Sequence, residues 1–368
     1  MRRLLGIAAT LALAAALPAA PASAARPVAT AISVTGENGC ALMSDGTVRC
    51  WGANGHGQLG DGTRRRSRTA VAVRGLTDAK AISIGAGSCA LIAGGTVKCW
   101  GDNHYGQLGD GTTTTRLTPV TVSGLGEAVA IAVGTTGACA LLADRTVRCW
   151  GSNLLGGLGN GTRTGSRTPV AVSGLTGVTA VSYEDEHGCA LLAGGTVACW
   201  GWNGREGSQN RSGDQLTPAV VPGVSGAVAL DAHAYNDCAL LDSGVPECWD
   251  SFAMPHPVRR FGRVLAYAWS NDGLQTEHDC ALMPNRTVEC YSPFPLWGQL
   301  GNGSRRRVKR PVTVIGVHGA VALSTSGFHT CALLAGGVVK CWGHYQTLND
   351  DRMNTSSPLP AAVRGLSR

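Results

Sequence analysis

Short stretches in which larger apolar residues alternate with small or polar ones recur along the chain. Residues 119–122 read Pro-Val-Thr-Val, and residues 129–133 read Val-Ala-Ile-Ala-Val. A period of two is typical of β-strands with two distinct faces, and no segment after residue 30 follows the 3.6-residue period of a helix. Gly, Asp and Asn residues, which favour turns, separate the stretches. The pattern therefore predicts an all-β protein.

The cysteine spacing indicates that these strands belong to tandem repeats. The 14 cysteines form pairs whose members lie ten residues apart, and successive pairs are separated by 49, 50, 50, 49, 42 and 51 residues. A fixed period in this range is typical of propellers and solenoids. The pairs are Cys40 and Cys50, Cys89 and Cys99, Cys139 and Cys149, Cys189 and Cys199, Cys238 and Cys248, Cys280 and Cys290, and Cys331 and Cys341.

Each repeat holds four strand-like segments, which is the content of one propeller blade. The sequence therefore predicts a seven-bladed β-propeller with four short antiparallel strands per blade, in a single domain of residues 25–368. An open solenoid of sheets is the alternative, but solenoids usually have shorter repeats and distinct caps. We expect the repeats to begin near residues 28, 78, 127, 177, 226, 264 and 319.

The spacing within each cysteine pair predicts one disulfide per blade. A three-residue turn over residues 44–46, with Gly46 in the left-handed conformation, places Cys40 opposite Cys50 at a non-hydrogen-bonded position. The Cα atoms at such a position approach to about 4.5 Å, which a disulfide spans. Zinc is the alternative, but zinc-binding cysteines usually lie two to four residues apart and converge on one point. The positions equivalent to Gly46 hold Gly except at Arg145 and Arg286.

The N-terminus has the layout of a signal peptide. Arg2 and Arg3 precede an apolar run over residues 4–17, and small residues follow at 22–24. We expect a signal peptide over residues 1–24, because the run is shorter than the about 20 residues that span a bilayer. The first cysteine, Cys40, is too distant for a lipid anchor. The chain is therefore expected to be secreted, without a transmembrane helix, into an oxidising environment that favours disulfides.

The repeated text resembles the regulator of chromosome condensation repeat. Residues 40–52 read Cys-Ala-Leu-Met-Ser-Asp-Gly-Thr-Val-Arg-Cys-Trp-Gly, residues 57–63 read Gly-Gln-Leu-Gly-Asp-Gly-Thr, and similar text recurs over about residues 28–366. The resemblance implies a seven-bladed propeller. The family's eukaryotic founder is a guanine-nucleotide exchange factor, but the export signal and the lack of an inserted segment argue against that activity here. Secreted bacterial propellers of similar blade plan, one of which inhibits β-lactamases, imply a binding role.

The sequence offers no candidate catalytic residue, cofactor site or metal site. The chain has no Gly-x-Ser-x-Gly elbow, His-Glu-x-x-His helix or phosphate-binding loop. Asp61 and its equivalents provide one short polar side chain per Gly-rich loop, which suits a turn better than a calcium site. His187, His278 and His329 occupy one position of the repeat that elsewhere holds Asn or Gly, so we expect polar groups with a structural role beside turns.

Two basic clusters occupy the same place in their repeats, between the Gly-rich loop and the next strand. In a seven-membered ring one blade would separate them, so they are expected to face the same side and to frame a basic patch. Such a patch would attract an acidic protein, a cell-wall polyanion or extracellular DNA. Solvated loops without a ligand are the alternative. The clusters are Arg64, Arg65, Arg66 and Arg68, and Arg305, Arg306, Arg307, Lys309 and Arg310.

The charge of the whole chain is modest. Its formal net charge of +7 falls to +5 without Arg2 and Arg3, because 29 basic residues then face 24 acidic ones. Nucleic-acid binding usually requires a stronger bias, so the sequence gives it only weak support.

Copies five and six depart from the repeat. Copy five lacks the Gly-Gln-Leu-Gly loop, and copy six carries the extra residues 292–296. Exposed aromatic residues and Met in such loops are common at protein-binding hot spots, although loop drift explains the same pattern. The candidate residues are Phe252, Met254, Phe294 and Trp297.

These features predict a secreted, monomeric binding module that recognises a protein or polyanionic partner through loops on one propeller face. An extracellular hydrolase or lyase at the mouth of the channel and a carbohydrate-binding propeller are the alternatives. The sequence leaves open the identity of the partner, the functional face, and the way in which the terminal strands close the ring.

Overall fold

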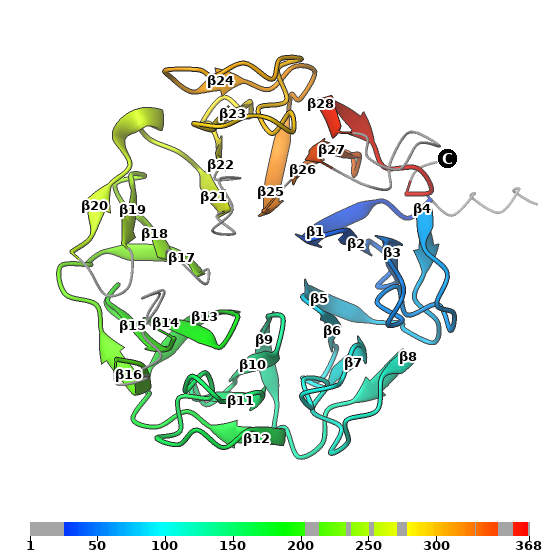
Figure 1. The fold of residues 1–368 in the computed structure, drawn as a ribbon, viewed down its shortest axis with the longest axis vertical. Coiled ribbons are helices and arrows are strands. Elements are labelled where there is room, and N and C mark those ends of the chain that lie inside the picture. Colours follow the sequence, from blue (N-terminus) through cyan, green and yellow to red (C-terminus); the bar gives the residue numbers. More distant parts are fainter. Residues whose placement is uncertain are drawn as a thin grey trace, which may run out of the picture.

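Seven four-stranded sheets stand around a central axis and form a closed ring (Figure 1). The computed structural model describes residues 26–202, 213–232, 237–249, 254–270, 278–327, 329–344 and 356–366. Each sheet consists of four consecutive antiparallel strands, with the first strand innermost. The predicted seven-bladed β-propeller is therefore confirmed. We number the blades 1 to 7 along the chain.

The first strand of each blade faces the centre of the ring (Figure 1). These strands are β1 (Ala29–Thr35), β5 (Ala79–Ile84), β9 (Ala128–Val133), β13 (Val178–Glu184), β17 (Ala227–Ala232), β21 (Ala266–Ser270) and β25 (Ala320–Ser326). The outermost strands are β4 (Ser67–Ala72), β8 (Arg116–Thr121), β12 (Ser166–Ala171), β16 (Gln215–Val220), β20 (His256–Pro257), β24 (Val312–Thr313) and β28 (Ser356–Ala362).

The second and third strands of each blade form a tight hairpin. The second strands are β2 (Asn38–Met43), β6 (Gly87–Ile92), β10 (Gly137–Leu142), β14 (His187–Leu192), β18 (Asp237–Leu241), β22 (His278–Leu282) and β26 (His329–Leu334). The third strands are β3 (Val48–Gly52), β7 (Val97–Gly101), β11 (Val147–Gly151), β15 (Val197–Gly201), β19 (Pro246–Trp249), β23 (Val288–Tyr291) and β27 (Val339–His344).

The hairpin register confirms the predicted disulfides. Cys40 pairs with Cys50 across the hairpin, and the same register recurs in all seven blades. Every pair forms a disulfide within its blade, with Cα atoms 4.0–4.1 Å apart, and no cysteine is free. The turn requires a left-handed residue, which is Gly46 in blade 1 (φ 77°). Arg145 and Arg286 adopt the same conformation (φ 65° and 64°) because the turn geometry overrides their preference.

The hydrophobic core lies in the seams between neighbouring blades. In each seam the disulfide side of one blade packs against apolar residues of the next, so Cys40 and Cys50 share a core cluster with Trp100 of blade 2. Equivalent clusters contain Trp150, Trp200, Trp249, Trp342 and, between blades 7 and 1, Trp51. These six indole rings are at most 1% exposed. The repeated tryptophans are therefore packing residues.

The Gly-rich loop between the third and fourth strands covers the tryptophan of the next blade. The indole Nε1 of Trp100 donates a hydrogen bond to the carbonyl of Gln58 (2.9 Å), and Trp150 donates equally to Gln107 (2.9 Å). A Cβ atom on Gly109 would lie 2.8 Å from Trp150 Nε1, which explains the requirement for glycine there. Trp200 and Trp342 donate to the same place in the loops before them.

In blades 1 to 3 one asparagine holds the Gly-rich loop in shape. The Asn54 side chain accepts from the Leu59 amide (2.9 Å) and donates to the carbonyls of Thr63 and Arg65. Asn103 and Asn153 make the equivalent bonds in blades 2 and 3. The predicted turn role of the short polar side chain is also confirmed, since the Asp61 carboxylate accepts from the Thr63 amide.

The ring closes without a shared strand. Blade 7 consists of β25–β28 alone and packs directly on β1. The Val34 amide donates to Ser324 Oγ (3.0 Å), as the Ile84 amide does to Ser33 Oγ (3.3 Å) in an ordinary seam. Arg49 then donates to the carbonyl of Gly365 (3.1 Å). The strand contact of the closing seam is therefore the same as that of the ordinary seam.

Among the residues that the structure describes, the single helical element is the 3₁₀ turn η1 (Arg259–Phe261), which connects blades 5 and 6. Among the described residues, no helix has the length and apolar character needed to cross a membrane.

The seam contact can be tested by placing a methyl group against an indole. Gly109 and Gly124 have nearly the same φ (67° and 66°), but nothing lies within 4 Å of a Cβ at Gly124. We expect Gly124→Ala to cost about 1 kcal/mol of unfolding free energy through backbone strain. Gly109→Ala should cost about 1–3 kcal/mol more, because Trp150 must move. Guanidinium denaturation of the two disulfide-intact variants measures the difference, and equal midpoints would contradict the steric role of Gly109.

Candidate functional site

The seam between blades 5 and 6 departs from the others. At the tryptophan position blade 6 carries Tyr291, which is only partly buried. The link from β19 to β20 spans residues 250–255 alone, so blade 5 has no Gly-rich loop in the sequence to cover this ring. Residues 250–253 lie outside the described part of the chain, Phe252 among them. This seam therefore differs from the four in which a Gly-rich loop accepts a hydrogen bond from the indole of the next blade.

A hollow of about 580 Å³ lies at this seam. Its residues flank the outermost strands of the two blades: Arg260 follows β20, and the remaining basic residues precede β24. The guanidinium of Arg260 lies over the Tyr291 ring, 4.6 Å from its centroid. The lining residues are Arg260, Tyr291, Pro293, Lys309, Arg310 and Pro311.

The electrostatics of the hollow are positive. Arg260 forms an ion pair with Asp279 (Nη1 to Oδ2, 3.3 Å), and this carboxylate also accepts a hydrogen bond from the Tyr267 hydroxyl (2.9 Å). Burial, together with the charge of Asp279, raises the pKa of Tyr267 well above its ordinary value, so the hydroxyl stays a donor. Lys309 and Arg310 are exposed and form no ion pair with any described carboxylate. Two of the three cations therefore remain available to an anionic ligand.

The rim of the hollow joins two predicted features that are separate in the sequence. The Arg307 guanidinium stacks over the Phe294 ring (4.7 Å to the centroid), and its Nε donates to the Pro293 carbonyl (2.7 Å). The second basic cluster and the inserted loop of copy six thus form one surface. Arg305 and Arg306 are exposed beside it.

The other predicted aromatic and Met residues lie apart from this stacking contact. Trp297 is 38% exposed and packs against the His344 ring of blade 7, with centroids 4.6 Å apart. Met254 is 71% exposed in blade 5. Neither residue lines the hollow.

The first basic cluster lies in blade 1, and blade 7 separates it from the second cluster (Figure 1). Arg64, Arg65 and Arg66 are exposed, whereas Arg68 lies on β4 and is partly buried. Arg64 donates to the carbonyl of Gly55 (2.6 Å) and so folds back over its own loop. The cluster therefore remains a separate candidate surface.

The three repeated histidines are buried. His187, His278 and His329 begin β14, β22 and β26 and are at most 4% exposed. This position faces the next blade, and the imidazoles of His187 and His278 each contact a polar side chain across the seam. His187 Nε2 lies 3.0 Å from Asp237 Oδ2, and His278 Nε2 lies 2.8 Å from Thr330 Oγ1. The predicted structural role agrees with these contacts.

The seam environment shifts the pKa values of His187 and His329 in opposite directions. Burial disfavours the charged form of His187, but the adjacent Asp237 carboxylate outweighs it and raises the pKa. Burial, together with the charges of His278 and His344, lowers the pKa of His329 to about 3. His187 also lies near the sulfurs of Cys189 and Cys199, but these form a disulfide and are not available to a metal.

The repeat matches a known family. The model of the Regulator of chromosome condensation (RCC1) repeat matches residues 45–92 and 94–141, and a second model with the same description matches residues 29–58 and 128–156. The chain belongs to the RCC1-repeat family. No curated protein matches this chain in sequence.

Solved structures share the propeller at low sequence identity. Human WBSCR16 superposes with a TM-score of 0.71 at 19% identity, over 83% of this chain and 87% of that one. Yeast RCC1 (Prp20), crystallised with Kap60, gives a TM-score of 0.70 at 16% identity, over 98% and 91%. The ectodomain of the Arabidopsis thaliana receptor kinase ACR4 gives 0.53 at 18% identity, over 90% and 100%. At these identities the RCC1-repeat chain shares their fold alone.

Acid should destabilise the RCC1-repeat propeller through His329. The folded protein keeps this side chain neutral down to about pH 3, whereas the unfolded chain takes up the proton below about pH 6.5. Stability is therefore lost as the pH falls between these values, by on the order of 4 kcal/mol at pH 3. His329→Asn introduces the residue that blade 1 has at this position, Asn38, and should weaken the pH dependence.

The test is the denaturation midpoint measured between pH 7 and pH 3, with the exposed His318→Asn as a matched control. A His329→Asn profile that falls as steeply as that of the wild type would show that other groups cause the acid sensitivity.

Proposed function

We propose that this RCC1-repeat propeller is an exported binding module that recognises an acidic segment of a protein at the seam between blades 5 and 6. The observation that supports this most is the hollow formed by Arg260, Tyr291, Lys309 and Arg310. It provides cations for carboxylates and an aromatic wall for apolar side chains.

A protein partner fits this surface better than a simple polyanion. Alongside its cations the hollow has Tyr291 and two prolines, and Phe294 stacks on Arg307 at its rim. Aromatic residues and arginines are enriched at protein interfaces, where buried anchors contribute most of the binding energy. The yeast RCC1 structure with Kap60 shows that a propeller of this fold forms a protein complex in that case.

The proposed export is supported by the cysteine chemistry. Fourteen cysteines form seven disulfides within the described blades, and such bonds persist in oxidising compartments. The predicted signal peptide, residues 1–24, lies outside the described part of the chain.

Binding should depend on the position of the charge and not on the total charge. We expect Lys309→Ser/Arg310→Ser to weaken binding of a fluorescent Glu- and Asp-rich peptide about tenfold, since each lost pairing costs up to about 1 kcal/mol. Arg65→Ser/Arg66→Ser removes the same charge from exposed positions of blade 1 and should change the affinity less than twofold. Fluorescence anisotropy at low and moderate salt measures both.

Equal losses in the two double variants would indicate non-specific attraction and contradict the proposed site. Binding of heparin with no binding of the peptide would replace the protein partner by a polysaccharide.

The mature protein should begin at Ala25. Intact-mass spectrometry of the protein from the medium of the producing cells should give the mass of residues 25–368 with all 14 cysteines oxidised. A secreted mass that still includes residues 1–24 would contradict cleavage after Ala24.

A further inference from the structure

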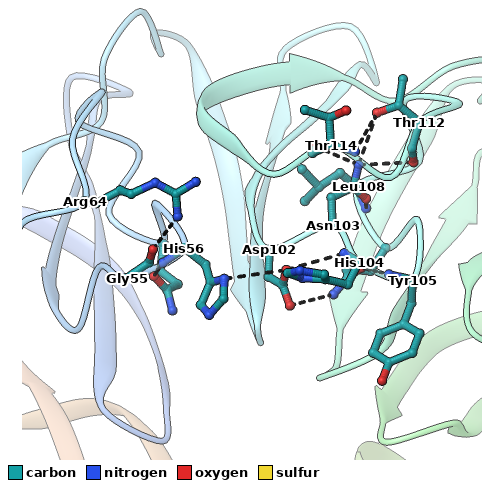
Figure 2. A network of polar contacts seen from close by, with 12 residues as sticks. Gly55, His56, Arg64, Asp102, Asn103, His104, Tyr105, Leu108, Thr112 and Thr114 are labelled. Carbon is teal, nitrogen blue, oxygen red and sulfur yellow. Dashed lines mark hydrogen bonds and ion pairs between the residues drawn. The ribbon is translucent and has the colours of Figure 1, made fainter.

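Two histidines and one aspartate meet at the seam between blades 1 and 2 (Figure 2). His56 belongs to the Gly-rich loop of blade 1, whereas Asp102 and His104 lie in the loop that follows β7 in blade 2. One ligand atom from each of the three side chains lies within 4.8 Å of the other two. The cluster is far along the ring from the hollow of blades 5 and 6 and does not depend on the proposed function.

The Nδ1 atoms of the two imidazoles lie close to the same carboxylate oxygen. Asp102 Oδ1 lies 3.8 Å from His56 Nδ1 and is in direct contact with His104 Nδ1. The two imidazole rings are nearly perpendicular (79°), with centroids 5.7 Å apart. Figure 2 shows both rings directed toward the carboxylate from opposite sides. Two nitrogens and one oxygen are therefore close to the separation that a shared metal ion requires.

The backbone around the cluster is fixed before any ligand binds. Asn103, between the two blade-2 ligands, accepts from the Leu108 amide and donates to the Thr112 and Thr114 carbonyls (Figure 2). The Asp102 carboxylate also accepts from Gln107 Nε2 (3.4 Å) and is only 17% exposed. Partners of this kind orient a ligand and strengthen metal binding.

The Arg64 side chain does not enter the cluster. Arg64 donates to the Gly55 carbonyl (2.6 Å), on the side of His56 away from Asp102 (Figure 2). The imidazoles of His56 and His104 are 51% and 65% exposed, so an ion reaches them from solvent.

The propeller scaffold does not require these residues. At the next seam the same three positions hold Tyr105, Ser152 and Leu154, none of which is a typical metal ligand. At the seam between blades 6 and 7, Trp297 and His344 take the places of His56 and Asp102 and pack ring against ring. The His–Asp–His combination is thus a local departure from the repeat.

We propose that His56, Asp102 and His104 bind a divalent transition-metal ion of the Zn²⁺ type and bridge blades 1 and 2. Imidazole nitrogen and carboxylate oxygen are donors that Zn²⁺ accepts at about 2.0–2.2 Å. Three protein ligands leave a fourth position for water or for an outside donor. Because the metal replaces protons on the imidazoles, acid weakens its binding.

The experiment titrates ZnCl₂ into the untagged, disulfide-intact protein by calorimetry, so that no purification tag contributes histidines. We expect one equivalent of Zn²⁺ per chain at pH 7. His56→Ala and His104→Ala should each weaken binding at least tenfold. His318→Ala removes an exposed histidine elsewhere and should leave the affinity unchanged.

A second readout separates metal binding from damage to the fold. Zn²⁺ should raise the melting temperature of the wild type but not that of His56→Ala/His104→Ala, because a ligand of the folded state alone stabilises it. In EDTA the two proteins should melt alike, since both side chains are exposed. Unchanged Zn²⁺ affinity in the double variant, or no binding near one equivalent in the wild type, would overturn the proposal.

Discussion

The contact between an indole ring and the Gly-rich loop of the preceding blade holds neighbouring blades together. Trp100, Trp150, Trp200 and Trp342 are fully buried, and each donates its N–H to a loop carbonyl. Truncating a buried tryptophan typically costs about 3–5 kcal/mol, so the repeated seams supply much of the stability of a fold whose single blades are too small to bury a core. The disulfides act inside each blade and present a rigid face to the same seam.

The candidate binding hollow follows from the loss of this contact. Copy five has no Gly-rich loop in its sequence, and copy six has Tyr291 in place of tryptophan. Arg260 lies over the ring of the partly buried Tyr291, and Lys309 and Arg310 complete a positive lining. A position that elsewhere serves packing thereby lines a surface hollow, while the six other core clusters maintain the ring.

The sequence predicted most residues of the candidate surface, but not which of them lie together. The second basic cluster and the inserted loop of copy six were separate signals, and the structure joins them through Arg307 and Phe294. Arg260 could not be predicted from the sequence. Its role depends on the link between blades 5 and 6, which places it over the ring of Tyr291, 31 residues further along the chain. His56 and Asp102 lie 46 residues apart and carry no metal-binding spacing. The only available clue was that the equivalent positions in other copies hold unrelated residues.

The sequence by itself determined the all-β class, the blade number, the hairpin register and the seven disulfides, because each depends on local alternation, turn chemistry or a fixed ten-residue spacing. Tertiary structure alone decided the contacts between blades. The buried environment of His187 and His329, and the closure of β25–β28 directly on β1, arise where residues about 50 or nearly 300 positions apart are brought together. The reason is physical: a period-two pattern specifies which residues point out of a sheet, whereas the partner of an outward-pointing residue depends on the rotation between successive sheets.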